Sequence, residues 1–320
     1  MCNAVCDTKK RGAWTVIQQE LAERVCVPRT EGTVELYSNE EEDDDEKKYN
    51  SFVTFMFPHN LLKEYSSTVL GPQLYRGFSR CSSLSPCFSI LPVLRYVGGV
   101  DVSFVKGSSL AVASLVILEY PSMQRLRVFL HHCEVTEPYI PGFLAFREVG
   151  PIIELIGNAR GTLMKEGCFP QLLLVDGCGV HHPFRCGLAS HLGVKLDIPT
   201  IGCAKNFMSV DGITRERMNE LFTTAENKEN HSEISPVVKP IIGQSGLLWG
   251  YAITPNSHVK KPIFVSPGHR IGYAEATALV LSMCKHRVPE PIRAADSTSR
   301  ECIRLMTVQS NSLESENVRN

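Results

Sequence analysis

Three apolar runs rich in β-branched residues follow one another in the middle of the chain. RYVGGVDVSFV begins at Arg95, SSLAVASLVILEY follows from position 108, and RLRVFLHHCEV ends at position 135. The short polar segments KGSS and PSMQ separate them. Runs of this length, divided by turn residues, are typical of strands joined by hairpins. The pattern therefore predicts an antiparallel meander over 95–135.

After the meander, helical and strand patterns alternate. Apolar residues recur at helical spacing over 147–166, QLLLVD at 171–176 reads as a buried parallel strand, and PFRCGLASHLGVKLDIP predicts a helix ending near Gly193. TIGCA at 200–204 predicts another buried strand, and a polar stretch over 209–236 is at best partly helical. GLLWGYAIT and PIFVSPG are further strand candidates before a helix over 270–284. The order indicates a mixed α/β sheet, an antiparallel meander followed by parallel strands, flanked by helices.

The two ends of the chain differ in character from this body. Trp14, Ile17, Leu21 and Val25 predict an amphipathic helix over 13–27. Residues 29–92 hold an acidic run and a Ser- and Pro-containing stretch without a sustained period, which predicts a disordered insertion. We therefore expect an N-terminal helix at 1–28 packed on the main domain, the insertion at 29–92, the main domain at 93–304 and a polar, frayed tail at 305–320.

The cysteines and the apolar runs bear on location and on metal chemistry. The 320 residues contain 12 cysteines, mostly within apolar stretches, and lack both an apolar run of eighteen residues and a signal-peptide pattern. We expect reduced cysteines in a cytosolic or nuclear protein, the nucleolus included, and not a secreted one. A zinc site of Cys178, Cys186, His181 and His182 is a weaker alternative, because the cysteine spacing is not that of a zinc ribbon or finger.

Charge along the chain is uneven. The net charge is −1, but residues 40–48 (EEEDDDEKK) carry −5, so the rest of the chain carries +4. A mildly basic remainder is compatible with an anionic partner without requiring one.

Three carboxylates interrupt apolar elements where they could serve chemistry. Asp101 lies within a strand, Asp176 ends another, and Glu148 begins a helix. Each has a structural alternative: Asp176 could cap a turn, the helix dipole favours Glu148, and hydrogen bonds could offset the burial of Asp101. Together they are the hard oxygen ligands that Mg²⁺ or Mn²⁺ prefers, and a two-metal centre of such groups cleaves phosphodiesters.

Two more polar residues could complete this site. His269 lies just before the last long helix and could act as a metal ligand, a general acid or base, or a phosphate contact. It could equally be a structural histidine in a turn. Lys205 follows a buried strand and could neutralise a phosphate, although an exposed lysine at a strand end is commonly only solvated.

Five motifs in a fixed order resemble the endonuclease V family. They are VGGVDVSFVKG (97–107), PYIPGFLAFREV (138–149), LLLVDGCGVHHPFRCGLASHLGV (172–194), IGCAK (201–205) and VSPGHRIGYAEA (265–276), and the resemblance runs from about 95 to about 304. It implies a ribonuclease H-like fold and Mg²⁺-dependent hydrolysis, with Mn²⁺ as a substitute, of the second phosphodiester bond 3′ to an inosine. It also implies that Asp101, Glu148 and Asp176 bind the metal, with His269 and Lys205 in support.

The resemblance also implies which residues contact the nucleic acid. Tyr139, in the wedge Pro138, Tyr139, Ile140 and Pro141, would stack in the gap left by an everted base, although the same loop could be an ordinary surface turn. Hypoxanthine would meet a backbone site whose glycines permit close approach, and His182 would contact the backbone nearby. The further residues implied at this site are Gly142, Leu144, Gly177, Gly179, Gly187 and Leu188.

The chain departs from the family pattern at two places. Cys178 replaces a polar residue in the turn after Asp176, and the segment at 29–92 is longer than the usual connection, being either a lineage insertion or a mispredicted exon. Arg293, Asp296 and Arg300 lie in a C-terminal block that also resembles the family, where we expect support of the site.

The resemblance predicts inosine-containing single-stranded RNA or DNA as the partner. The motifs are similar in sequence to those of animal family members, which favours RNA over DNA as the substrate. The implied biological process is nucleic-acid repair or inosine-RNA metabolism. Rival functions are a catalytically weak inosine-binding module of the same fold and a different ribonuclease H-like nuclease akin to an excision-repair subunit. A hydrolase using Cys203 or Cys186 with His182 or His191 lacks any oxyanion motif.

Overall fold

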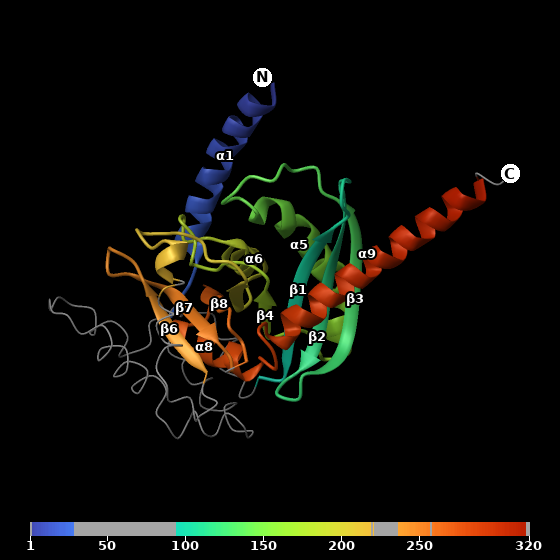
Figure 1. Ribbon diagram of the computed structural model, residues 1–320. Coiled ribbons are helices and arrows are strands. Elements are labelled where there is room, and N and C mark those ends of the chain that lie inside the picture. Colours follow the sequence, from blue (N-terminus) through green and yellow to red (C-terminus); the bar gives the residue numbers. More distant parts are fainter. Residues whose placement is uncertain (1, 29–93, 219, 221–235, 257, 318–320) are drawn as a thin grey trace.

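An eight-stranded mixed sheet organises the part of the chain that the structure describes (Figure 1). The structure is a computed structural model, and it describes residues 2–28, 94–218, 220, 236–256 and 258–317. The strand order is β3-β2-β1-β4-β5-β8-β7-β6. The strands are β1 (Tyr96–Phe104), β2 (Leu110–Glu119), β3 (Gln124–Glu134), β4 (Leu172–Val175), β5 (Thr200–Ala204), β6 (Val237–Ile242), β7 (Leu248–Thr254) and β8 (Ile263–His269).

The pairing of the strands follows the sequence pattern closely. β1, β2 and β3 form the predicted antiparallel meander, which is confirmed. β4 pairs in parallel with both β1 and β5, as expected for short, fully apolar runs. β8, β7 and β6 then extend the sheet in antiparallel fashion. The mixed α/β fold predicted from the sequence is therefore correct.

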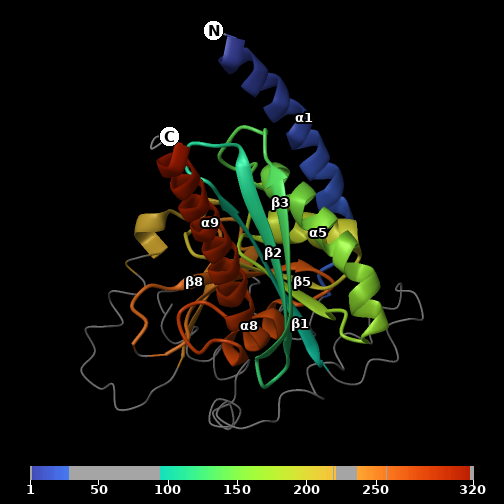
Figure 2. The ribbon, with the colours of Figure 1, turned by 90° about the vertical axis from the view of Figure 1, so that its right-hand side faces the viewer.

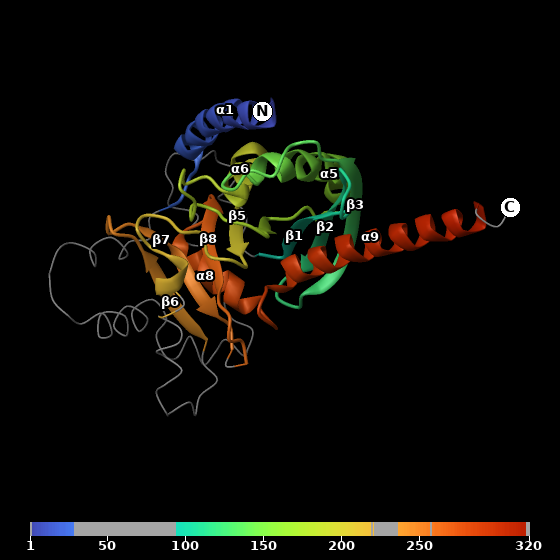
Figure 3. The same cartoon turned by 45° about the horizontal axis from the view of Figure 1, so that its top comes forward.

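Helices cover both faces of this sheet (Figure 3). α5 (Ala145–Lys165) and α6 (Leu188–Leu196) lie on one face, while α8 (Tyr273–Ser282) and α9 (Glu290–Asn317) lie on the other. Figure 2 shows α9 and α5 on opposite sides of the β1–β3 meander. The N-terminal helix α1 (Cys2–Arg24) packs against α6 as an outer layer.

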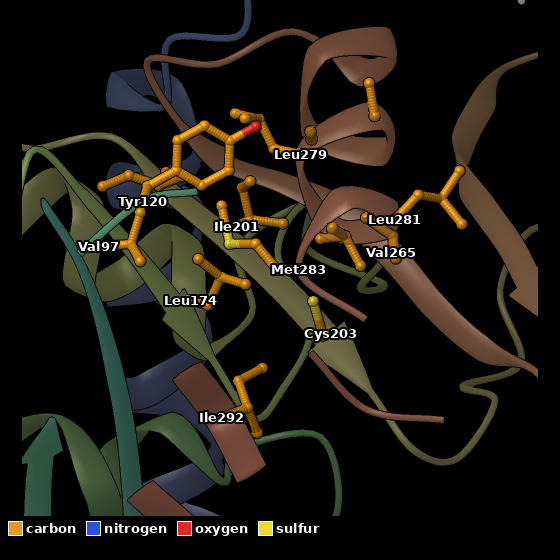
Figure 4. Packing of buried hydrophobic residues seen from close by; sticks show 14 of the residues in the cluster. Val97, Tyr120, Leu174, Ile201, Cys203, Val265, Leu279, Leu281, Met283 and Ile292 are labelled. Carbon is orange, nitrogen blue, oxygen red and sulfur yellow. The ribbon is translucent and has the colours of Figure 1, made fainter. Parts of the chain in front are cut away.

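Two apolar clusters, one on each face, join the layers. Leu174 and Ile201 pack towards α8 and α9 together with Leu279 and Ile292 (Figure 4). The alternate positions, such as Leu173, pack towards α5 and α6. Because both faces of the central strands are buried, these strands read as continuous apolar runs in the sequence.

One glycine explains how α9 approaches the sheet so closely. A Cβ atom on Gly99 would lie 1.9 Å from the carbonyl oxygen of Pro291, at the start of α9. Only a residue without a side chain fits there. The VGGVD segment of β1 therefore provides the seat on which α9 begins.

Three elements differ from the sequence prediction. α1 begins at Cys2 rather than near position 13, and α9 runs without a break to Asn317, so the residues expected to form a frayed tail from 305 are helical up to 317. β6 lies where the sequence pattern indicates no strand, and as an edge strand it accommodates Pro240. The proposed insertion at 29–92 lies outside the described residues. Within the described chain, no helix combines the length and apolarity needed to cross a bilayer.

The two ends of the sheet carry different residues. β1, β4 and β5 run in the same direction, so Tyr96, Leu172 and Thr200 begin these strands at one end of the sheet. β8 runs the opposite way, and its last residue, His269, pairs with Thr200 at that same end. Whatever follows β4 and β5 lies at the other end.

Candidate active site

Two aspartates meet where β1 and β4 run side by side. Val100 pairs with Val175 in the parallel ladder, so the residues that follow, Asp101 and Asp176, lie at the same level on neighbouring strands. Burial raises the pKa of both carboxyls, and the charge of Asp176 raises that of Asp101 further. Hydrogen bonds and a cation oppose this effect, since Ser299 and Ser103 donate to Asp101 and Lys205 faces Asp176.

Glu148, in the helical layer that packs on the sheet, interacts electrostatically with both aspartates. It stands in the first turn of α5 and is 8% exposed. Burial raises its pKa to about 8, and the charges of Asp101 and Asp176 contribute to the same shift. The three predicted carboxylates therefore repel one another at one end of the sheet, an arrangement that favours a cation or a proton between them.

Lys205 and Asp296 extend this acidic group. Lys205, directly after β5, places its Nζ 2.5 Å from Asp176 Oδ2 and 3.9 Å from Asp296 Oδ2. Asp296 belongs to α9 and also accepts a hydrogen bond of 2.7 Å from Arg300 Nε. Arg287 donates to the carbonyl oxygen of Lys205 at 2.7 Å, which fixes the backbone that carries the lysine. Asp296, expected only to support the site, thus faces its lysine directly, whereas the side chain of Arg293 pairs with Glu290 instead.

The donor set suits a hard divalent cation in chemistry but is not closed around one. The acids offer only carboxylate oxygens, the ligands of Mg²⁺ and Mn²⁺. Among the described residues, however, no three His, Cys, Asp or Glu side chains are gathered tightly enough to enclose an ion. Asp176 is instead engaged by Lys205 and Asp101 by Ser299. The weaker alternative, a zinc site of Cys178, Cys186, His181 and His182, finds no such cluster among the described residues either.

The position of His269 corrects the expectation that it belongs to the carboxylate group. His269 pairs with Thr200 at the start of β5, whereas Lys205 follows the end of that strand. Five strand residues at about 3.3 Å each separate the two positions by roughly 16 Å. His269 Nδ1 accepts the backbone N–H of Cys26 at 3.1 Å, and its Nε2 lies 3.7 Å from Asp197 Oδ1. It therefore anchors the segment after α1.

The predicted wedge lies beside the carboxylates. Tyr139 is 65% exposed, while its neighbour Ile140 is buried against Trp14 and Phe143. The Arg147 guanidinium carbon lies 6.0 Å from the centre of the Tyr139 ring and 4.5 Å from that of Phe104, at the end of β1. Because Arg147 directly precedes Glu148, the loop Pro138–Pro141 presents its aromatic ring next to the start of α5.

At most of the glycines predicted to contact the base, other parts of the chain fill the space where a side chain would lie. A Cβ on Gly179 would lie 1.9 Å from Pro267 O, one on Gly187 2.4 Å from Cys178 O, and one on Gly177 3.2 Å from the Leu188 side chain. Because these glycines lack a side chain, the neighbouring loops can pack directly against their backbone. Gly142 differs, since its φ is +84° and nothing lies within 4 Å of its Cβ position.

Short hydrogen bonds tie these loops together. His182 Nε2 lies 2.9 Å from Gly142 O, and the Gly187 N–H donates to Gly179 O at 2.9 Å. Leu144 immediately precedes α5 and links the wedge to Glu148. The wedge, the turn after β4 and the segment before α6 therefore form one connected structure.

The cysteines near the site are structural. Cys178 packs in an apolar cluster with Phe207 and Trp249. The cysteine that stands where relatives have a polar residue therefore makes an apolar contact. Burial raises the pKa of Cys178 and Cys186 to about 12 and that of Cys203 well above its usual value. Such thiols are poor nucleophiles at neutral pH, which argues against the thiol-hydrolase alternative.

The fold and the acids define a protein of the ribonuclease H-like class, with an acidic site where β1 and β4 run side by side. The endonuclease V family model matches residues 82–297, and the chain belongs to the endonuclease V family. It is therefore a nuclease, a hydrolase.

Relatives with names and structures agree with this assignment. Human endonuclease V is 41% identical over 218 residues, which is 66% of this chain and 72% of the human protein. The structure of the catalytic domain of human endonuclease V superposes with a TM-score of 0.67 at 31% identity, covering 93% of this chain and 98% of that one. Endonuclease V of Ciona intestinalis, in complex with a 23mer DNA containing an inosine followed by a ribo-adenosine, gives 0.68 at 26% identity and the same coverage.

Proposed function

We propose that this chain is a Mg²⁺-dependent endonuclease, with Mn²⁺ as a substitute, that hydrolyses the second phosphodiester bond 3′ to inosine. Single-stranded RNA is the proposed main substrate and deaminated DNA a second one, in nucleic-acid repair or inosine-RNA metabolism. The observation that carries the proposal is the mutual repulsion of Asp101, Glu148 and Asp176 at the sheet end beside an exposed aromatic ring.

In this mechanism Asp101, Asp176 and Glu148 provide oxygen ligands. A bound divalent cation would activate a water and stabilise the leaving 3′ oxygen. Lys205 Nζ, held between Asp176 and Asp296, is placed to offset the negative charge of a phosphate.

Tyr139 and the loops behind it supply recognition. Its exposed ring would fill the gap left by an everted base, and stacking of this kind contributes about 1–3 kcal/mol per base. Inosine carries an N1–H donor where adenosine carries an acceptor, so fixed backbone groups can select it by leaving the adenine edge unpaired. The loops proposed for that task are joined to one another by hydrogen bonds, and they carry Gly142, Gly177, Gly179, His182, Gly187 and Leu188.

The deciding experiment is cleavage of 5′-labelled single strands carrying one inosine, as RNA and as DNA, with adenosine strands as controls. Each is incubated with Mg²⁺, Mn²⁺ or EDTA, and with wild type or Asp101→Ala. We expect a product that ends one nucleotide beyond the inosine, only with metal and only with wild type. Tyr139→Ala should weaken binding about five- to a hundredfold, and Tyr139→Phe should retain it.

Two results would overturn parts of this proposal. Binding of inosine strands without any cut would make the chain a binding module of the same fold. Faster cutting of DNA than of RNA would reverse the substrate preference and leave the inosine-directed chemistry in place.

A further inference from the structure

A glutamine of the N-terminal helix is fully buried beneath the loops that carry the proposed recognition residues. Gln18 is 0% exposed, and its Nε2 donates to Cys186 O at 3.0 Å and to Gly142 O at 3.5 Å. A side-chain NH₂ group has two N–H donors, so these two carbonyls use both. Among the described residues its Oε1 meets no hydrogen-bond partner, so the polar contacts of this side chain run through its NH₂ group.

The two carbonyls belong to different loops that meet at the same place. Gly142 follows the wedge and Cys186 directly precedes Gly187 and Leu188. Gly142 O also faces His182 Nε2 at 2.9 Å, so one carbonyl joins the wedge loop, the His182 segment and α1. Its left-handed φ of +84° aims this carbonyl inward, a conformation that other residues adopt with strain.

Aromatic packing holds α1 in the position that this contact needs. The Trp14 ring stacks on Phe146 with centroids 4.7 Å apart and planes within 5°. Phe143 contacts the same ring at 5.9 Å, and Phe184 packs on Phe143 at 5.9 Å. At the start of the wedge, Lys10 pairs with Glu137 at 2.7 Å. Buried hydrogen bonds in such apolar surroundings are strong and costly to break.

We propose that Gln18 is a positioning residue for inosine selection. Its amide sets the separation and orientation of the Gly142 and Cys186–Leu188 loops, so that their backbone groups meet the hypoxanthine edge and not the adenine edge. The inference rests on the proposed function. It assigns a part in specificity to α1, a helix that contributes none of the carboxylates of the candidate active site.

The test replaces the amide by an isosteric carboxylate. Gln18→Glu in the full chain replaces the NH₂ group by a carboxyl oxygen that has one donor when protonated and none when ionised, so at least one of the two carbonyls loses its bond. Gln19→Glu makes the same chemical change on the exposed side of the helix and is the matched control. Gln18→Met removes both donors at similar volume and without a buried charge.

The readouts are KM and kcat on inosine RNA, the ratio of inosine to adenosine cleavage, and the unfolding midpoint. We expect Gln18→Glu to raise KM at least tenfold and to lower the ratio at least tenfold, with kcat changed less than threefold. Gln18→Met should shift both in the same direction by a smaller factor, and Gln19→Glu should match wild type. A purely structural role lowers the active fraction for both substrates equally and leaves the ratio unchanged.

The outcomes separate the two levels of inference. If wild type selects inosine and folded Gln18→Met keeps both KM and the selectivity ratio, the role of Gln18 is overturned and the proposed function stands. If wild type itself shows no preference for inosine, the proposed function fails and the role of Gln18 falls with it.

Discussion

Ser299 Oγ donates a hydrogen bond of 2.8 Å to Asp101 Oδ2, joining the last helix to the first strand. Ser299 is fully buried, and its Oγ also lies 2.8 Å from that of Ser103, which contacts the same carboxylate. This bond lowers the pKa of Asp101 against the opposing effect of burial. The residue that orients the proposed catalytic aspartate therefore stands 198 positions away from it in the chain.

Ser299→Ala should lower cleavage while leaving the fold intact. Hydrogen bonds to charged groups contribute about 1.5–3 kcal/mol, so we expect a loss of roughly ten- to a hundredfold in kcat/KM. Ser297→Ala, whose hydroxyl donates to the Ala294 carbonyl one turn back in the same helix, should stay near wild type. Equal activity of the two variants would show that Asp101 does not depend on α9 for its orientation.

Glu148→Gln should abolish cleavage and stabilise the metal-free protein. The folded pKa of about 8 lies above the ordinary 4.5, so the wild-type carboxyl costs the fold free energy as pH rises through that interval. The advantage of the glutamine variant should grow from pH 4.5 to pH 8 and reach the order of 3–5 kcal/mol. Urea unfolding in EDTA at several pH values measures this, with exposed Glu20→Gln of α1 as the control. A pH-independent difference would contradict the burial argument.

His269→Leu should loosen α1 more than it impairs the chemistry. The lost acceptor for the Cys26 N–H weakens the attachment of the segment after α1, which the Arg270 N–H still holds at Cys26 O, so amide exchange of α1 should accelerate roughly five- to tenfold. Cleavage should fall by a smaller factor than in Asp101→Ala. A variant as inactive as Asp101→Ala, with α1 exchange unchanged, would return His269 to the catalytic group.

Acid should destabilise the fold through buried histidines. Burial, aided by Lys195, lowers the pKa of His191 to about 4, and burial does the same to His181. Because the unfolded chain binds these protons near pH 6.5, their contribution is complete above that pH and is lost as pH falls towards 4. His191→Gln should reduce the loss between these pH values by roughly 3 kcal/mol, and exposed His258→Gln should leave it unchanged. Identical pH profiles for wild type and His191→Gln would reject this account.

The sequence predicts β4 and β5 well because each is a short, fully buried apolar run, and the aspartates meet because β1 and β4 pair in parallel. It misplaces His269 because a residue before a helix gives no sign of which way its strand runs. β8 is antiparallel to β5, and this direction alone decides that His269 lies at the far end from Lys205.

The importance of Asp296 was hidden for a related reason. Its i, i+4 spacing to Arg300 reads as an ordinary helical ion pair, and that pair does form, at 2.7 Å. Only the tertiary docking of α9 brings the same carboxylate to Lys205. Gln18 carries no sequence signal either, since a glutamine in an amphipathic helix is normally solvated and its burial depends on the aromatic residues around Trp14.

The acids and the residues around His269 lie at opposite ends of the sheet, and this separation affects how the chain can change in length during evolution. The described chain leaves α1 at Cys26, which is bound beside His269, and it re-enters the sheet at the start of β1. Both junctions lie at the end of the sheet remote from the acids. Additions or deletions between them alter the length of the gene without shifting the spacing between Asp101, Glu148 and Asp176, so this connection is where lineages can diverge in size at little catalytic penalty.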